Sequence, residues 1–249
     1  MKQRIQNAFN RAASTYGQVA RVQKQIAEHA ASLVPRKKYR NILEIGCGNG
    51  QSTQALQSRL GCESYCALDL APNMLKQARL QCPRAFYLAA DGENPPLRRH
   101  SFDLLFSTSC VQWYLNPEKS LSDNLALLVR GGHFSLSMFI KGTFYEIEEC
   151  KRQTGYGSVL ELRDQQEYIE IFEKKSKIHE CVARDYTVFY NSFYDFAKQN
   201  KQSGAVTTSS PTYGNKRKKE DFIATYTRLY GREDKIQVTY KALFISGTA

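Results

Sequence analysis

The amino-acid sequence predicts an α/β protein built on a doubly wound, seven-stranded sheet with an N-terminal helical cap. Three observations favour this class. Strand-like and helix-like segments alternate through most of the 249 residues, the first strand-like segment ends in closely spaced glycines, and residues 236–246 alternate apolar and polar side chains as a closing antiparallel strand does. With 42% hydrophobic residues, the chain is long enough for one large core with an additional lobe.

Residues 4–34 carry apolar and small side chains at spacings of three and four, which predicts an amphipathic helix with Gly17 as a candidate break. A helix that precedes an α/β sheet can close over a ligand pocket. Tyr16 and Gln23 would then present polar tips among apolar neighbours, although packing explains Tyr16 equally well.

The segment that organises the chain is a strand over 41–45, followed by Gly46, Gly48 and Gly50 and by a helix over 51–60. Glycines between a strand and a helix let a ligand approach the backbone closely, because no Cβ intervenes and the free N–H groups of the helix lie nearby. The dinucleotide fingerprint requires a differently spaced third glycine, so NAD is disfavoured. We predict a nucleotide-type site, with a turn that binds no ligand as the alternative.

Further site residues follow the next strands. The second strand ends in Asp69, which is placed to accept hydrogen bonds from both hydroxyls of a ribose, and the next helix, from Pro72, brings Met74 either to the base or to the core. The third strand leads to Asp91, and the fourth leads to residues 107–113, which we expect to form the floor of the site. These three strands are expected over 64–68, 85–89 and 102–106.

The remaining elements are predicted from the same periodicities and from turn residues. They are a helix over 118–129, a strand over 133–139, a helix that opens after 142–143, a charged helix over 164–175, a strand over 178–190, a helix over 191–201, a loop over 207–213 and a basic helix over 216–230.

Charge is distributed unevenly along the chain. The net charge is +11, of which residues 1–40 carry +8 and residues 201–249 carry +5, so the middle of the chain sums to −2. Basic ends attract an acidic partner, which can be nucleic acid, a membrane surface or an acidic protein, although solvation explains each lysine taken singly.

The cysteines and the apolar segments bear on location. The seven cysteines include no C-x-x-C pair and lie inside expected strands and helices, which argues against a disulfide framework, and no Cys/His cluster has metal-ligand spacing. No segment approaches the ~20 apolar residues of a membrane span, and the chain begins without an apolar signal core. We expect a cytoplasmic protein with no membrane partner and no metal.

The pattern of Glu44, Gly46, Gly48 and Gly50 resembles motif I of the class I S-adenosylmethionine (SAM) methyltransferases, which have a Rossmann-like sheet. The resemblance implies SAM as cofactor, a loop that wraps its methionine part, and an acid, Asp91, that binds the adenine amino group. The cofactor-binding residues implied in this way are Tyr16, Gln23, Glu44, Gly46, Cys47, Gly48, Gly50, Asp69, Leu70, Met74, Asp91, Gly92 and Ser107.

A narrower resemblance covers nearly the whole chain. It rests on residues 9–13 with Tyr16 and Gln23, on LDLAPNML at 68–75, on SFDLLFS at 101–107 with Val111-Gln112-Trp113, and on VTYKALFISG at 238–247. These segments resemble the malonyl-acyl-carrier-protein O-methyltransferases of biotin synthesis. The resemblance implies methylation of the free carboxylate of malonyl-acyl-carrier protein, which gives the methyl ester that enters pimeloyl synthesis.

The resemblance also implies a domain layout and a partner. We expect one domain over 1–249, with a helical cap over 1–38, a SAM-binding half over 39–140 and a substrate-side half over 141–249. The carrier protein of that family is acidic, so the basic N- and C-terminal segments would form its landing surface, with Lys216–Lys219 as the contact.

Methylation of a carboxylate sets modest chemical demands. A malonyl carboxylate is ionised at neutral pH, so no general base is required. A cation binds a carboxylate strongly through charge-assisted hydrogen bonds, which makes Arg11 and Lys201 candidates to hold it. Tyr16 and Gln112 are candidate neutral partners of the carboxylate, and Trp113 is a candidate for a further substrate contact.

Two other functions fit part of the sequence. A methyltransferase that acts on RNA or a small molecule is the main alternative, because a pI near 9.3 also suits nucleic acid. Aromatic residues do not alternate with the basic ones, so we expect no nucleic-acid partner. A SAM-binding protein without catalysis would show the same glycine loop.

Overall fold

The computed structural model describes residues 1–205 and 216–249, so the loop predicted over 207–213 lies outside the described residues. The strands are β1 (Tyr39–Ile45), β2 (Cys62–Asp69), β3 (Phe86–Ala89), β4 (Phe102–Thr108), β5 (Leu128–Phe139), β6 (Lys177–Tyr190), β7 (Gly231–Arg232) and β8 (Lys235–Thr248). The helices are α1 (Lys2–Ala12), α2 (Tyr16–Val19), α3 (Arg21–Ser32), α4 (Gln51–Gln57), α5 (Pro72–Gln81), α6 (Pro117–Leu125), α7 (Tyr145–Thr154), α8 (Gln165–Glu173), α9 (Phe193–Gln202), α10 (Lys216–Tyr230) and the 3₁₀ helix Val111–Trp113. None of the helices in these ranges combines the length and the apolar character that crossing a bilayer requires.

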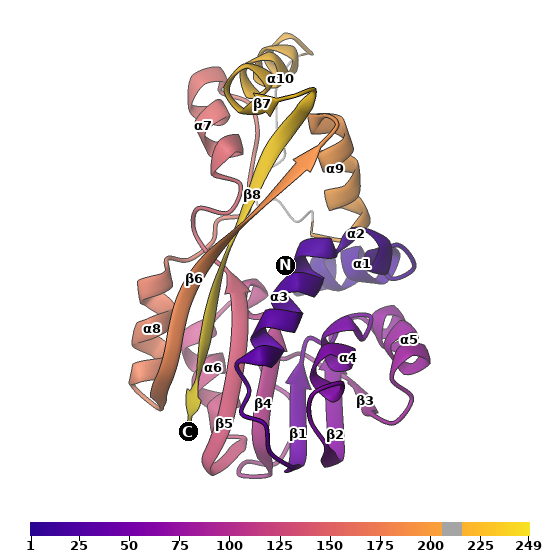
Figure 1. The fold of residues 1–249 in the computed structure, drawn as a ribbon, viewed down its shortest axis with the longest axis vertical. Helices are drawn as coiled ribbons and strands as arrows, with labels where there is room; N and C mark the ends of the chain where they lie inside the picture. The colour runs from indigo at the N-terminus through magenta and orange to yellow at the C-terminus, as the bar shows by residue number, and fades with distance from the viewer. Residues whose placement is uncertain (206–215) are drawn as a thin grey trace.

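One mixed sheet with the strand order β3-β2-β1-β4-β5-β8-β6 organises the chain, and the two-residue β7 pairs with β8 (Figure 1). The pairs from β3 to β5 are all parallel, whereas β8 runs antiparallel to both of its neighbours. Apolar side chains from both faces of the central strands are buried in two clusters, one on each side of the sheet. The predicted α/β class and its seven main strands are confirmed.

The N-terminal cap consists of three helices where the sequence predicts one. The breaks lie at residues 13–15 and at Ala20, which has φ −80° and ψ 49°, and Gly17 lies inside α2. Thr15 stabilises the first break because its Oγ1 donates to Ala12 O at 3.1 Å and to Gln202 O at 2.8 Å. The prediction of a break at Gly17 is therefore wrong, and α9 contacts the cap at this point.

The strand β5 begins earlier than its sequence predicts. The helix expected over 118–129 ends at Leu125, and Leu128 already pairs with Phe102 of β4. Gly131 lies inside the strand with a φ of 72°, and the register shifts between Phe102 and Leu104. A glycine at positive φ permits such an irregularity within a strand.

The strands β6 and β8 project beyond the rest of the sheet. They pair from Lys177 opposite Thr248 to Tyr190 opposite Ile236, whereas β5 pairs with β8 only over His133–Phe139. The projecting ends carry α7, α9 and α10, and we call this part the upper lobe (Figure 1). Aromatic rings fill it, and one contact between them joins Phe193 of α9 and Phe222 of α10, whose ring centroids are 5.0 Å apart. The cap lies between the upper lobe and the parallel part of the sheet (Figure 1).

Candidate functional site

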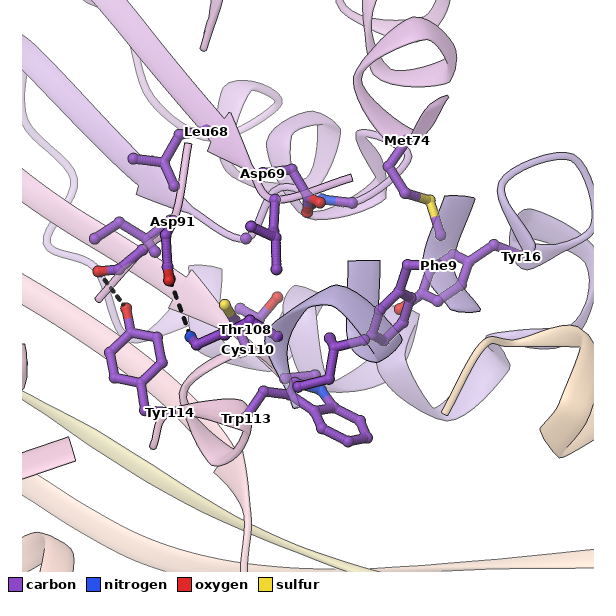
Figure 2. Close-up of a pocket in the computed structure, with 18 residues that line it drawn as sticks. Phe9, Tyr16, Leu68, Asp69, Met74, Asp91, Thr108, Cys110, Trp113 and Tyr114 are labelled. Carbon is purple, nitrogen blue, oxygen red and sulfur yellow. Dashed lines mark hydrogen bonds and ion pairs between the residues drawn. The ribbon is translucent and has the colours of Figure 1, made fainter. Parts of the chain in front are cut away.

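A pocket opens where β1, β2 and β4 end, and α1 and α2 cover it (Figure 2). This is the edge at which doubly wound sheets bind ligands. In Figure 2, Asp91 and Tyr114 lie at one end of the pocket, and Phe9 and Tyr16 lie at the other. The lining residues are Lys2, Ile5, Phe9, Tyr16, Ile45, Gly46, Gly48, Leu68, Asp69, Leu70, Met74, Asp91, Gly92, Thr108, Ser109, Cys110, Trp113 and Tyr114.

The glycine loop forms one wall of the pocket. Gly46, Gly48 and Gly50 have φ values of 76°, 54° and 95°, a region that favours glycine. A Cβ added at Gly46 would lie 2.4 Å from the Sγ of Cys110, whereas a Cβ added at Gly48 would meet no atom within 4 Å. The missing side chain of Gly48 therefore leaves space in the pocket that a ligand can fill.

Asp69 stands at the end of β2 beside this loop. Its Oδ2 accepts a hydrogen bond from Gly48 N at 2.9 Å, and its Oδ1 accepts one from Ala71 N at 2.8 Å. Burial raises the pKa of Asp69, while these two N–H donors oppose the rise. Each carboxylate oxygen has further acceptor capacity, so the side chain can still bind the two hydroxyls of a ribose.

Asp91 lies at the far end and contacts the first helix. Its Oδ1 accepts from Lys2 Nζ at 3.0 Å and from Glu93 N at 3.0 Å, so Oδ2 remains for a ligand amino group. Lys2 Nζ also lies 2.6 Å from Glu93 Oε2 and 5.3 Å from the ring centroid of Tyr114. Burial would raise the pKa of Glu93, but hydrogen bonds from Lys2 and from backbone N–H groups hold it below its ordinary value.

The backbone at Gly92 is fixed by Tyr114 and Asn124. The Tyr114 hydroxyl and Asn124 Nδ2 both donate to Gly92 O at 2.9 Å. A Cβ at Gly92 would lie 2.6 Å from Ile45 Cγ2 and 2.8 Å from the Tyr114 hydroxyl. Only glycine fits this position without a shift of its neighbours, which keeps the adenine end of the predicted site rigid.

Aromatic side chains close the opposite end. The ring of Phe9 packs edge-on against Trp113 at 5.8 Å and against Tyr16 at 6.4 Å. Met74 is buried beside them. Burial raises the pKa of Tyr16 well above its ordinary value, and Asp69 and Cys110 raise it further, so the phenol stays protonated at physiological pH.

Ser109 lies on the floor of the pocket in a strained conformation, with a φ of 50°. Its carbonyl accepts from Gln112 Nε2 at 2.8 Å, and its N–H donates to Ser137 O at 2.9 Å. Its Oγ is buried and finds no hydrogen-bond partner among residues 1–205 and 216–249. A buried hydroxyl without a partner is costly, which points to a partner supplied by a ligand.

Nine of the residues predicted for the site line this pocket. They are Tyr16, Gly46, Gly48, Asp69, Leu70, Met74, Asp91, Gly92 and Trp113. Their positions agree with the predicted ligand, but which atoms each would bind stays a prediction.

Four predicted cofactor residues lie behind the pocket wall instead. The buried carboxylate of Glu44 accepts hydrogen bonds from Ser52 at 2.5 Å, Thr53 at 2.6 Å and Tyr65 at 2.8 Å. It faces away from the pocket because side chains alternate along β1 and its neighbour Ile45 faces the pocket. Cys47 is buried. Gly50 packs against α5, since an added Cβ at this position would lie 3.0 Å from Ala78 Cα. The hydroxyl of Ser107 is used within the protein, because its Oγ donates to Ile45 O at 2.8 Å. The side chains of Glu44 and Ser107, and the position of Gly50, support the loop rather than line the pocket.

Of the residues predicted to contact the substrate, Tyr16 and Trp113 line the pocket, and Arg11, Gln112 and Lys201 do not. Arg11 and Lys201 are both exposed, and neither lines the pocket. Arg11 lies two positions from Phe9 on α1, which turns it away from the pocket face of that helix. Gln112 supports the carbonyl of Ser109 from behind, and Gln23 lines a different cavity. These two cations therefore lie outside the pocket, and their contact with a substrate carboxylate stays a prediction.

Several lining residues were missed by the sequence prediction. They are Lys2, Ile5, Phe9, Ile45, Leu68 and Tyr114, whereas Thr108, Ser109 and Cys110 belong to the segment 107–113 that was expected to form the floor. For Lys2, Ile5 and Phe9 a signal existed, because positions 2, 5 and 9 share one helical face with Tyr16 of the cap. For Tyr114 there was none, since its orientation depends on a contact 22 residues away.

Comparisons with known proteins agree with this geometry. A family model described as a methyltransferase domain matches residues 43–136. A malonyl-acyl-carrier-protein O-methyltransferase of Paenibacillus sp. (strain JDR-2) is 30% identical over 271 residues, which cover 98% of this chain and 98% of the relative. The enzyme of the same description from Brevibacillus brevis is 28% identical over 264 residues, which cover 98% and 95%.

Solved structures agree at the level of the fold. The crystal structure of a Bacillus halodurans C-125 protein assigned as a methyltransferase superposes with a TM-score of 0.65 at 15% identity, covering 90% of this chain and 98% of that chain. A likeness at this identity shows the shared α/β fold alone.

Proposed function

Because the chain belongs to the malonyl-acyl-carrier-protein O-methyltransferase family, we propose that it transfers a methyl group from SAM to the free carboxylate of malonyl-acyl-carrier protein. The product is the malonyl methyl ester that enters biotin synthesis. The observation that carries the proposal is the full-length relationship at 30% identity, and the pocket at the ends of β1, β2 and β4 supports it.

The residues of the pocket fit SAM. Gly46 and Gly48 offer a wall without side chains, Asp69 offers acceptors for ribose hydroxyls, and Asp91 Oδ2 offers an acceptor for an adenine amino group. When bound, SAM supplies an electrophilic methyl group on a sulfonium. The chain's own task is then to place a carboxylate in line with that methyl group and to exclude water.

The accepting carboxylate needs no proton removed, because it is ionised at neutral pH. The hydroxyls of Tyr16 and Ser109 are the neutral donors that could orient it, since the first stays protonated and the second is buried without a partner among the described residues. Phe9 and Trp113 pack against each other at the same end and keep water out. Alignment rather than acid–base chemistry is thus the contribution of these side chains.

An acidic carrier protein is the proposed partner, and the basic chain ends are its proposed landing surface. The first turn of α10 supports this, because Lys216, Arg217, Lys218 and Lys219 are exposed on the upper lobe. Exposed cations attract an acidic surface at low ionic strength and are screened at high ionic strength. The kcat/KM for malonyl-carrier protein should therefore fall as salt rises.

One incubation tests the function. Purified protein, SAM and malonyl-carrier protein should yield a carrier heavier by one methylene, detected by intact-mass spectrometry. No mass gain with folded protein and competent substrate would refute the activity. The alternative of an RNA or small-molecule substrate is less supported, and the cytoplasm as the place of action stays a prediction.

A further inference from the structure

A second cavity, of about 230 Å³, lies between the N-terminal cap and the base of the upper lobe. Figure 1 shows the elements that surround it: α2 and α3 on one side, α9 and the projecting parts of β6 and β8 on the other. It contains Gln23, which the sequence placed in the cofactor site. The cofactor pocket does not use these residues, so the cavity requires its own explanation.

The cavity begins one helical turn from the cofactor pocket. Tyr16 lines the pocket, and Val19, three residues later on α2, lines the cavity. Residues three apart on a helix lie on the same face, about 4.5 Å apart along the axis. The cavity and the cofactor pocket are therefore neighbours along α2.

Two cations stand at its rim. Arg21 and Lys235 are exposed lining residues, and neither forms an ion pair with any residue in the described ranges. Residues 206–215 contain no Asp or Glu that could pair with them. One acid, Asp195, also lines the cavity, and its Oδ1 accepts a hydrogen bond from Gln199 Nε2 at 3.1 Å. The rim is thus net positive and suits an anion.

The interior offers neutral hydrogen-bonding groups. The hydroxyls of Tyr190 and Tyr240 lie 3.2 Å apart and are buried. The side-chain amides of Gln23 and Asn191 make no hydrogen bond with residues that the structure describes. Amides and hydroxyls of this kind complement a chain that itself alternates amide groups, a hydroxyl and short alkyl segments.

We propose that this cavity binds the phosphopantetheine arm of the acyl substrate, with Arg21 and Lys235 contacting its phosphate and Gln23, Asn191 and the tyrosine pair contacting its amide and hydroxyl groups. The inference rests on the proposed function, because it assigns the thioester arm of the same substrate. The arm has two sources, a carrier protein and coenzyme A, and both present the same phosphate and amides.

Kinetics with three malonyl thioesters test the assignment. Malonyl-carrier protein and malonyl-coenzyme A carry the phosphate, and malonyl-pantetheine lacks it. The double variant Arg21→Ala/Lys235→Ala should raise KM for the first two on the order of tenfold or more, because each lost cation removes a charge-assisted contact. The KM for malonyl-pantetheine should change less than about twofold, and the wild-type KM values show which source is preferred.

The control is Lys24→Ala, which removes a cation from α3 that does not line the cavity and should leave all three KM values unchanged. An equal loss with all three substrates, or no loss with any, overturns the assignment.

A binding measurement separates this result from failure of the proposed function. Wild-type protein should bind carrier protein that bears the arm more tightly than carrier without it, and the double variant should lose that difference even if no substrate is methylated. Equal binding of both carrier forms by the wild type also overturns it.

Discussion

The Nζ of Lys2 and the Oε2 of Glu93 lie 2.6 Å apart, which joins the first helix to the adenine end of the pocket. The same Nζ contacts Asp91, the predicted partner of the adenine amino group. The ion pair therefore does two things at once: it fastens α1 over the pocket, and it orients Asp91.

Lys2→Met should loosen this closure. The variant keeps the length of the side chain and removes its charge, so α1 loses its tie to Glu93 while Ile5 and Phe9 remain as apolar contacts. We expect SAM affinity to fall on the order of tenfold, or about 1.4 kcal/mol, by calorimetry. Lys38→Met, which breaks the exposed pair with Glu63 far from the pocket, should bind SAM like the wild type. Equal affinity in the two variants would contradict the role of Lys2.

Acid should open the cap in the wild type. Because the pKa of Glu93 in the folded protein lies below its ordinary value of 4.5, its pair with Lys2 stabilises closure above that value and is lost as pH falls through the lowered pKa. Trp113, the one tryptophan of the chain, contacts Phe9 of α1. Its fluorescence should shift to the red in that acid range before far-UV circular dichroism is lost. In Glu93→Gln the red shift should already be present at neutral pH. A wild-type spectrum that changes only with global unfolding would contradict the role of the Lys2–Glu93 ion pair in closing the cap.

Gly48→Ala should separate stability from cofactor binding. The new Cβ meets no protein atom, so the cost to folding is only that of a side chain at positive φ, about 1–2 kcal/mol. SAM affinity should fall at least about tenfold, because the Cβ occupies the wall that the ligand approaches. Gly131→Ala is the matched control, since its φ of 72° is similar and its Cβ also meets nothing, but it lies in β5 outside the pocket. Similar losses of SAM affinity in both would show a general backbone effect.

Ser109→Ala should affect the substrate more than the fold. The Oγ has no partner among the described residues, so its removal should leave the melting temperature unchanged or slightly higher, while KM for malonyl-carrier protein rises several-fold. Ser107→Ala, two residues earlier, removes the buried hydrogen bond to Ile45 O and should cost about 1 kcal/mol of stability. If Ser109→Ala instead lowers stability as much as Ser107→Ala and leaves KM unaltered, Ser109 has only a structural role.

The rate of methyl transfer should not depend on pH between about 6 and 9. The substrate carboxylate is ionised throughout this range. The pKa of Tyr16 is raised well above its ordinary value by burial, and burial raises the pKa of Cys110 to about 12, so neither lining group changes its charge. Single-turnover rates at saturating SAM and substrate measure this step. A bell-shaped profile centred near neutrality would indicate a general base.

The sequence predicts the sheet and the cofactor side of the pocket well, because both depend on local signals. Strand periodicity locates all seven main strands, and Asp69 and Asp91 follow from their positions at strand ends. Glu44 belongs to the glycine-loop motif, yet its side chain is buried behind the pocket wall, where the hydroxyls of Ser52 and Thr53 on α4 and of Tyr65 on β2 donate to it. A motif reports that a residue is required, but the alternation of the strand decides whether it touches the ligand.

Which side chains face the substrate is hard to predict from the sequence, because it depends on contacts between distant segments. Arg11 and Lys201 were chosen for their charge, and both are exposed. Ser109 carries no charge, and its orientation depends on a positive φ and on support from Gln112 and Ser137. Such positions follow from tertiary packing, which no local pattern of the sequence encodes.

The strand β8 begins among the helices of the upper lobe and ends between β5 and the edge strand β6 of the sheet. This fourteen-residue strand, the last of the chain, thus belongs both to the sheet and to the upper lobe. Truncation before residue 235 would remove an interior strand, leave β6 without a paired strand and expose one edge of β5, so the sheet and the upper lobe are not separable modules. Chimaeras that exchange substrate preference between relatives should therefore swap α7, α9 and α10 individually and keep the native carboxyl end.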